Sequence, residues 1–429
     1  MRPIFGPAGP ISLDDSGTRP NNGGVVPARV RAVAAVALLA LVAPVAAGGT
    51  TVAPLGTRLA RALAVPGVQP SRSAAYVVDL STGQVVFSQN TSMPLLPASN
   101  EKLALTYGAL TALGPAFRIE TDVLGEGAQE GATWQGSLVL KGYGDPTLSS
   151  QGLADLAQQI RDDGITRVAG RVLGDETWFD SRRTAPGWKP SFFIEESPPL
   201  SALIVDRGLV GRYTSLNPAL AAVQLFRKAL VRAGVQVAGG AQLGAADDEA
   251  MPLASIESPT LEAIVRWMDR VSDNFTAEML LKELGAVQAA HGTTAAGVGV
   301  VTGLLAQAGV PLDGVRLVDG SGLSLLDRMT TNALVSLLTT MWNDPSLRPE
   351  LLAALPVAGR RGTLEDRMRT GAATGVVAAK TGTTDNASAL SGFVGDRYVF
   401  SILQNGSPVD LGWARVAQDR FATILAASS

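Results

Sequence analysis

The chain has 429 residues, which is long enough for two or three domains with a sizeable core. Its formal net charge of -3 gives no electrostatic case for nucleic-acid binding. The absence of cysteine excludes a thiol nucleophile, disulfide bonds and thiolate zinc sites, and the single histidine, His291, is expected to be structural or solvent-facing.

The N-terminal segment up to Gly48 is typical of an export segment. Residues 1–28 are polar and rich in proline and glycine, which predicts a disordered tail. Residues 29–48 contain a basic start, an apolar run at 32–47 and a small-residue end suited to signal-peptidase cleavage. The run is shorter than the ~20 residues of a spanning helix. We favour a signal peptide, with a membrane anchor through residues 32–47 as the alternative, and predict an extracytoplasmic protein that is secreted, periplasmic or cell-wall associated.

A strand-turn-strand pattern at residues 75–80 and 84–87 predicts a hairpin. A leucine- and alanine-rich run then extends from Ser99 to Leu113 and predicts a helix, which Gly114 and the proline after it end. Residues three apart share a helix face, so the spacing places the Lys102 amine beside the Ser99 hydroxyl.

The composition changes at about residue 117. Up to residue 256, short β-like runs such as 136–140 alternate with one clear helix, 153–163, and with loops rich in tryptophan, proline and glycine. The stretch of chain between Lys102 and Ser272 is longer than one compact domain needs between two motifs. We therefore predict an inserted domain at residues 117–256, between the two parts, 71–116 and 257–429, of a discontinuous domain.

The remaining residues complete that discontinuous domain. A helix is predicted at residues 261–270, followed by the loop Ser272-Asp273-Asn274 and a second helix at 276–284. Three strands follow at 376–383, 387–394 and 397–403, and an amphipathic helix closes the chain at 413–427. Together with the early hairpin these strands give an α+β fold with a five-stranded antiparallel sheet.

Lysine is the expected base of the chemistry. The chain has no Gly-x-Ser-x-Gly motif to supply a Ser-His-Asp hydrolase with its serine. Only six of its 35 basic residues are lysines, among them Lys102 and Lys380. Arginine keeps its proton in proteins, whereas a buried lysine can lose its proton and act as a base.

Three motifs stand in a fixed order along the chain: Ser99-Asn100-Glu101-Lys102, Ser272-Asp273-Asn274 and Lys380-Thr381-Gly382. This order is the known signature of class A β-lactamases and penicillin-binding proteins. The chain resembles the class C low-molecular-mass penicillin-binding proteins, the D-alanyl-D-alanine carboxypeptidase/endopeptidase family. The likeness runs from about Ala75 to Asn405 and includes three further landmarks: residues 144–148, 319–324 and 362–364 with Arg367.

The resemblance implies a β-lactamase/transpeptidase-like domain, with a five-stranded antiparallel sheet flanked by helices, that carries one inserted domain. It implies a serine carboxypeptidase or endopeptidase that cleaves peptidoglycan stem peptides through an acyl-enzyme on Ser99. β-Lactam antibiotics would acylate the same serine because they mimic the peptide end. Neither a cofactor nor a metal is expected.

The family also implies residue roles. Ser99 would attack the penultimate D-alanine carbonyl while neutral Lys102 takes its proton, with the charge of Lys380 lowering the pKa of Lys102. Ser272 would relay a proton to the leaving group, and Asn274 would hold the substrate amide.

The third motif would bind the end of the substrate. Thr381 and Thr383 would bind the terminal carboxylate together with the Lys380 charge, and Gly382 would let the strand approach the substrate. The N–H groups of Ser99 and Thr383 would form the oxyanion hole. Two alternatives remain open at this stage: a β-lactamase, for which no deacylating carboxylate is assigned, and a wall-binding protein with a vestigial site.

Overall fold

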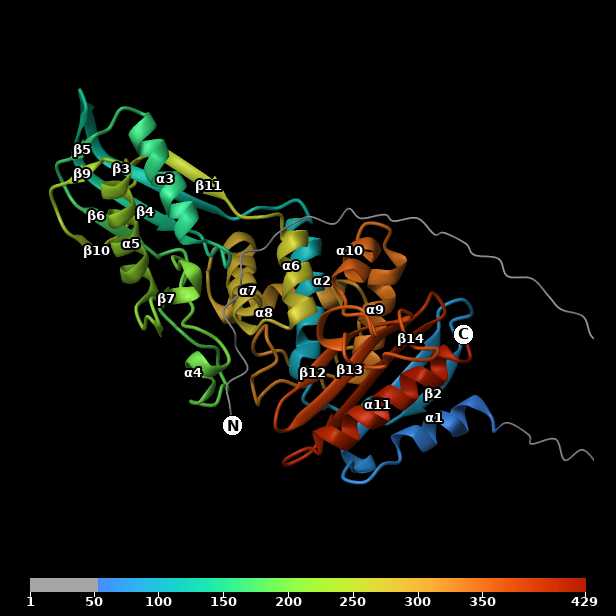
Figure 1. Ribbon diagram of the computed structural model, residues 1–429. Coiled ribbons are helices and arrows are strands. Elements are labelled where there is room, and N and C mark those ends of the chain that lie inside the picture. The colour runs from blue at the N-terminus through green and yellow to red at the C-terminus, as the bar shows by residue number, and fades with distance from the viewer. Residues whose placement is uncertain (1–52) are drawn as a thin grey trace, which may run out of the picture. The chain divides into compact units, whose positions relative to one another are not determined.

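The computed structural model describes residues 53–429, which form one compact unit (Figure 1). The tail predicted at 1–28 and the signal peptide or anchor predicted at 29–48 lie outside the described residues. Among residues 53–429, no helix has the length and apolar character needed to cross a membrane.

A five-stranded antiparallel sheet joins the two ends of the described chain (Figure 1). β1 (Ser73–Asp79) is paired on one side with β14 (Tyr398–Asn405) and on the other with β2 (Val85–Gln89), so strands from opposite ends of the chain become neighbours. The predicted α+β fold and its five strands are confirmed. In spatial order the strands are β12 (Val377–Thr383), β13 (Ala387–Val394), β14 (Tyr398–Asn405), β1 (Ser73–Asp79) and β2 (Val85–Gln89).

Each face of this sheet is covered, and successive residues of a strand alternate between the two faces. In β14, Val399 and Leu403 face a helical core, whereas Phe400 and Ile402 face a second core on the opposite side. The helices on the first side are α2 (Lys102–Leu113), α6 (Leu261–Val271), α7 (Asn274–Ala289), α8 (Thr294–Gln307), α9 (Thr331–Asn343) and α10 (Arg348–Ala354).

The second face is covered by α11 (Leu411–Ala426) and by α1 (Leu55–Leu63). The domain was expected to begin at residue 71, so α1 was not predicted. The sequence does carry an amphipathic pattern for this helix, because one face of it presents Leu55, Leu59, Ala62 and Leu63. Leu59 is completely buried in this core.

The segment predicted as an insert builds a second, mixed sheet of seven strands with its own hydrophobic core. Its independence as a domain stays a prediction, because residues 53–429 form one compact unit. The strands are β3 (Glu120–Glu130), β4 (Thr133–Gly142), β5 (Arg167–Val168), β6 (Val172–Asp175), β9 (Gln236–Val237), β10 (Ala241–Leu243) and β11 (Met251–Glu257).

Two helices pack against this second sheet, and only one of them was predicted. α3 (Ser150–Asp162) matches the expected helix, but α5 (Pro218–Arg232), capped by Asn217, was missed. The short helix α4 (Phe192–Glu195) and the small hairpin of β7 (Leu209–Val210) and β8 (Tyr213–Thr214) were also missed.

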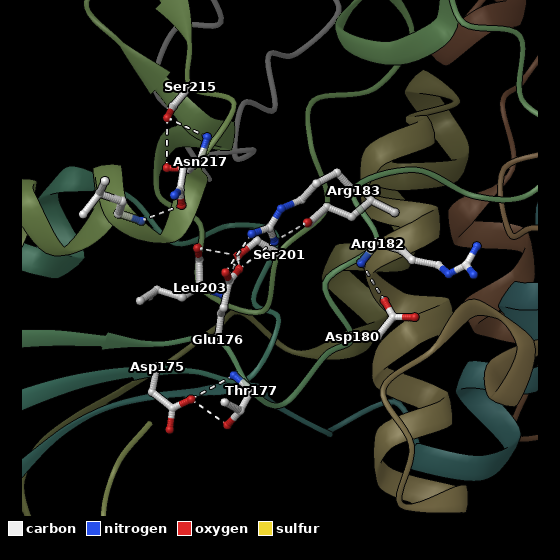
Figure 2. A network of polar contacts seen from close by, with 12 residues as sticks. Asp175, Glu176, Thr177, Asp180, Arg182, Arg183, Ser201, Leu203, Ser215 and Asn217 are labelled. Carbon is white, nitrogen blue, oxygen red and sulfur yellow. Dashed lines mark hydrogen bonds and ion pairs between the residues drawn. The ribbon is translucent and has the colours of Figure 1, made fainter. Parts of the chain in front are cut away.

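Hydrogen bonds and an ion pair hold the segment of chain that follows β6 (Figure 2). The Arg183 guanidinium donates to both carboxylate oxygens of Glu176, at 2.6 and 2.7 Å, and to the Leu200 carbonyl. The Ser201 hydroxyl also donates to Glu176. Burial acts to raise the pKa of Glu176, but Arg183 and Ser201 outweigh it and lower that pKa. The ionised pair therefore ties together the two ends of residues 176–201.

Burial of α1 generates a stability prediction. Leu59→Ala should lower the free energy of unfolding by about 2–5 kcal/mol, since it removes a buried side chain and leaves a cavity. Chemical denaturation would measure the change, with the exposed Arg61→Ala on the same helix as the control. Equal small losses in both variants would show that α1 does not belong to the folded core.

Candidate active site

Ser99 lies in the tight 3-10 turn Ala98–Glu101, directly before α2. The helix predicted from Ser99 therefore begins later, at Lys102. Ala98 has a left-handed φ of 47°, which bends the chain into the turn. A Cβ on Gly322 would overlap the Ala98 carbonyl oxygen, and one on Gly382 would stand 3.1 Å from the Ala98 Cβ. These two glycines let the loop 319–324 and strand β12 pack against the turn that carries Ser99.

The Lys102 amine is completely buried and lies beside the serine. Its Nζ is 3.1 Å from Ser99 Oγ, 2.9 Å from Asn274 Oδ1 and 2.7 Å from the Ser321 carbonyl oxygen. A neutral amine has two N–H donors and one lone pair. With the donors used by Asn274 and Ser321, the lone pair is left for the Ser99 hydroxyl, the arrangement that a base requires.

Electrostatics act in both directions on this amine. Burial disfavours the ammonium form and lowers the pKa of Lys102. Four carboxylates oppose this shift: Asp319, Asp273, Asp269 and Glu278.

The motif Ser272-Asp273-Asn274 forms the corner between α6 and α7. Ser272 ends α6 in a left-handed conformation, with φ of 63°, and Asp273 caps α7 by accepting the Thr276 N–H at 2.7 Å. Asp273 also pairs with Arg207 at 2.7 Å. Asp273 thus holds the start of α7 in place, and the corner turns Asn274 toward Lys102.

Lys380 lies completely buried on β12. Its Nζ donates to Ser272 Oγ at 2.8 Å and to the Thr381 carbonyl at 2.9 Å. Burial and then the nearby Lys102 charge lower the pKa of Lys380 to about 7, against the attraction of Asp269. Burial is the main cause of the lowered pKa at both lysines, and the repulsion between them adds to the lowering at Lys380.

The last three expected site residues follow along β12. The Thr381 and Thr363 hydroxyls are 2.6 Å apart, and Thr383 is exposed at the end of the strand. A Cβ on Gly382 would also stand 2.9 Å from the Pro97 carbonyl oxygen. Gly382 is thus required by packing against the serine turn, whereas its predicted role toward substrate is untested.

A set of buried acids lies under the site, and none of them was predicted to belong to it. Glu278 accepts the Ser321 N–H at 2.8 Å, and Asp319 accepts the Gly322 N–H at 2.7 Å, so they hold the loop whose carbonyl binds Lys102. Burial and Asp319 raise the pKa of Glu278 to about 8. A single glutamate inside a helix gives no sequence pattern by which this role could be found.

The predicted insert also reaches the site. Trp188 Nε1 donates to Asp319 Oδ2 at 2.8 Å, and the Asn274 amide donates to the Glu196 carbonyl at 3.2 Å. Every site residue was predicted to lie outside residues 117–256, so these contacts were missed. They join segments that are distant along the chain, and no local pattern reports on such contacts.

His291 lines a different hollow, a pocket of about 390 Å³ that also includes Trp178 and Asp180. Within residues 53–429, no group of three or more histidine, cysteine or acidic side chains has the arrangement to hold a metal ion.

Comparison with known proteins now identifies the family. The sequence pattern of the D-Ala-D-Ala carboxypeptidase 3 (S13) family matches residues 55–215 and 212–427. The chain belongs to this family. It is 33% identical to the D-alanyl-D-alanine carboxypeptidase of Actinomadura sp. (strain R39), over 80% of this chain and 79% of that protein. It is 32% identical to a carboxypeptidase of Mycobacterium tuberculosis, over 90% of this chain and 86% of that protein.

The fold agrees with this membership. The crystal structure of penicillin binding protein 4 from Haemophilus influenzae matches with a TM-score of 0.76 and 20% identity, over 87% of this chain and 98% of that one. The protein is a serine-type D-Ala-D-Ala carboxypeptidase, and the resemblance to class C low-molecular-mass penicillin-binding proteins is confirmed.

The lowered pKa of Lys380 predicts a pH-dependent KM. Above about pH 7 the Lys380 amine loses its proton. If its charge attracts the terminal carboxylate of a D-Ala-D-Ala peptide, the KM for that peptide should therefore rise with pH. Lys380→Arg keeps its charge and should have a flat KM between about pH 6 and 9. Steady-state kinetics over this range, with melting curves for both proteins, would measure the effect. A flat wild-type profile would contradict a charge-binding role for Lys380.

Proposed function

We propose that Ser99 is the nucleophile of this carboxypeptidase and that Lys102 is its base. The observation that carries the proposal is the fully buried Lys102 amine, 3.1 Å from Ser99 Oγ with its other contacts made to oxygen acceptors. Ser99 Oγ bonds to the carbonyl carbon of the penultimate D-alanine as its proton passes to Lys102. The tetrahedral intermediate then collapses, and D-alanine leaves.

The leaving amine needs a proton, and Ser272 supplies it in this proposal. Ser272 Oγ accepts from Lys380 Nζ at 2.8 Å, which orients the hydroxyl. The proton given up by Ser272 is replaced through the lysines, so the serine ends unchanged. Asn274 holds the substrate amide once its present partner, the Glu196 carbonyl, is displaced.

Substrate binding uses the exposed end of β12. Thr381, Thr383 and the Lys380 charge bind the terminal carboxylate, and Gly382 completes the close fit of the strand. The N–H groups of Ser99 and Thr383 stabilise the oxyanion. Because the buried lysines and their partners are all present, the geometry supports a working peptidase over a wall-binding protein with a vestigial site.

The substrates in this proposal are peptidoglycan stem peptides, and β-lactams are inhibitors that acylate Ser99. A structure of the Haemophilus influenzae protein in complex with a β-lactam has the same fold, with a TM-score of 0.71. Mass spectrometry of purified muropeptides would separate loss of a terminal D-alanine from cleavage of a crosslink.

Lys102→Arg tests the base. Arginine stays protonated and cannot accept the Ser99 proton, so D-alanine release and penicillin acylation should each slow by about 100- to 10,000-fold. Second-order acylation rates would be compared with those of Lys380→Arg, which should be affected less, and melting curves would confirm folding. Acylation of Lys102→Arg at nearly the wild-type rate would place the base elsewhere.

We also propose that the protein acts outside the cytoplasm, since its substrates lie there and residues 29–48 have the pattern of a signal peptide. Sequencing the N-terminus of the exported protein should give a start near Gly48. An intact Met1 on a membrane-bound product would instead support the anchor at residues 32–47.

A further inference from the structure

The pocket beside His291 lies between the predicted insert and the end of α7, and no residue of the three motifs lines it. Segments 177–180 of the insert and 290–293 of the turn after α7 form its walls, together with Ala286. Its volume of about 390 Å³ falls in the range of about 300 to 1,000 Å³ that small-molecule sites occupy. We call it the His291 pocket.

Backbone contacts hold the two walls of the His291 pocket together. The Asp180 N–H donates to the Gly292 carbonyl at 3.0 Å, and a Cβ on Gly292 would overlap the Trp178 carbonyl oxygen. Ala290 ends α7 in a left-handed conformation, with φ of 56°, and turns the chain toward His291. The fold itself therefore fixes the shape of the pocket.

Aromatic side chains give the His291 pocket apolar surface. Trp178 and Phe179 both line it. Trp178 Nε1 donates to the buried Glu283 carboxylate at 2.7 Å. The Tyr143 ring packs against the indole in a T-shaped arrangement, with 5.2 Å between ring centroids. These two contacts hold the indole in one orientation.

Hydrogen-bonding groups accompany the aromatic surface. The contacts of the Asp180 carboxylate to Lys282 and to the Arg182 N–H both use Oδ1, which leaves Oδ2 as an acceptor (Figure 2). The exposed His291 imidazole can both donate and accept. Because the Asp180 charge is paired with Lys282, the pocket suits a neutral polar ligand better than an ion. A sugar ring, with C–H groups on its faces and hydroxyl groups at its edge, matches this lining.

The His291 pocket lies at a suitable distance from the active site. Trp178 lines the pocket, and the same segment of the insert continues to Trp188, which binds Asp319. Along α7, Ala286 at the pocket lies more than three turns beyond Asn274, which is about 18 Å. In a stem pentapeptide four residues separate the scissile bond from the sugar. They span about 14 Å at most, and the linkage to the sugar adds to this reach.

We propose that the His291 pocket binds a sugar of the glycan strand that carries the stem peptide. The inference rests on the proposed function, because it takes peptidoglycan as the substrate. It gives segment 177–180 a role in substrate choice that the three motifs do not supply. The enzyme should prefer muropeptides, which carry the sugar, to free peptides of the same sequence.

Binding can be measured directly, because His291 is the only histidine of the chain. In untagged protein, the NMR signal of its imidazole reports on this pocket alone. Di-N-acetylchitobiose, a neutral disaccharide of N-acetylglucosamine, should shift the signal in a saturable way, whereas the sugar-free stem tetrapeptide should not. Absence of a saturable shift at millimolar disaccharide would overturn the proposal, as would an equal shift caused by the tetrapeptide.

Steady-state kinetics test the same subsite during turnover. The wild-type KM for a disaccharide-pentapeptide should be at least about tenfold lower than that for the sugar-free pentapeptide, since the sugar adds binding away from the reacting bond. His291→Ala should raise the muropeptide KM by about 3- to 10-fold, the effect of one lost hydrogen bond, and leave kcat and KM for the free peptide unchanged. Gln288→Ala is the matched control, because Gln288 is exposed at the same end of α7 and does not line the pocket.

The outcomes separate this inference from the proposed function. Equal KM values for the two substrates in the wild type would reject the sugar subsite and leave the carboxypeptidase intact. A muropeptide KM that rises equally in His291→Ala and Gln288→Ala would also reject it. Absence of D-alanine release from both substrates would instead reject the proposed function itself.

Discussion

Two lysine amines lie completely buried in the site, Lys102 at 3.1 Å from Ser99 Oγ and Lys380 at 2.8 Å from Ser272 Oγ. Removing an ammonium from water costs several kcal/mol even after the protein relaxes, and two neighbouring ammonium groups cost more. The site accommodates them by favouring the neutral form and by placing acids nearby. This constraint accounts for the unusual chemistry: the same burial that destabilises the charge makes an amine available as a base.

The buried acids are the counterpart of the buried lysines. Glu278 and Asp319 accept backbone N–H groups of the loop 319–324, and that loop returns a carbonyl to Lys102. Removing one acid would therefore disturb both the charge balance and the position of an acceptor. Asp269, which accepts a hydrogen bond from the Thr106 hydroxyl at 2.7 Å, acts on Lys380 through its charge, which favours the ammonium form.

Local patterns predicted the parts of the site that depend on local geometry. The three-residue spacing of Ser99 and Lys102 predicted their contact, and the β-like runs near the C-terminus predicted the strand that carries Lys380. The start of α2 was predicted wrongly, because the left-handed bend at Ala98 depends on packing against Gly322 and Gly382. Those glycines lie far along the chain from Ala98, and no local signal reports on them.

Long-range contacts also explain what was missed. The contact of Glu278 arises only after folding, when helix α7 meets the loop 319–324. Glu278 belongs to no short motif that reports this contact. By contrast, α1 has a readable amphipathic pattern around Leu59, but no element was predicted between the apolar export segment and the first strand.

The predicted insert is not merely attached to the peptidase fold. Arg207 pairs with Asp273, the residue that caps α7, while Trp188 binds Asp319 and Phe179 packs in one cluster with Phe275. Asp273 directly precedes Asn274, and Asp319 accepts the N–H of Gly322, the residue after Ser321, so both acids lie next to the acceptors of the Lys102 amine. A displacement of the insert would therefore shift Asn274 and the loop 319–324 together. The position of the Lys102 amine thus depends on segments of the predicted insert as well as on the three motifs.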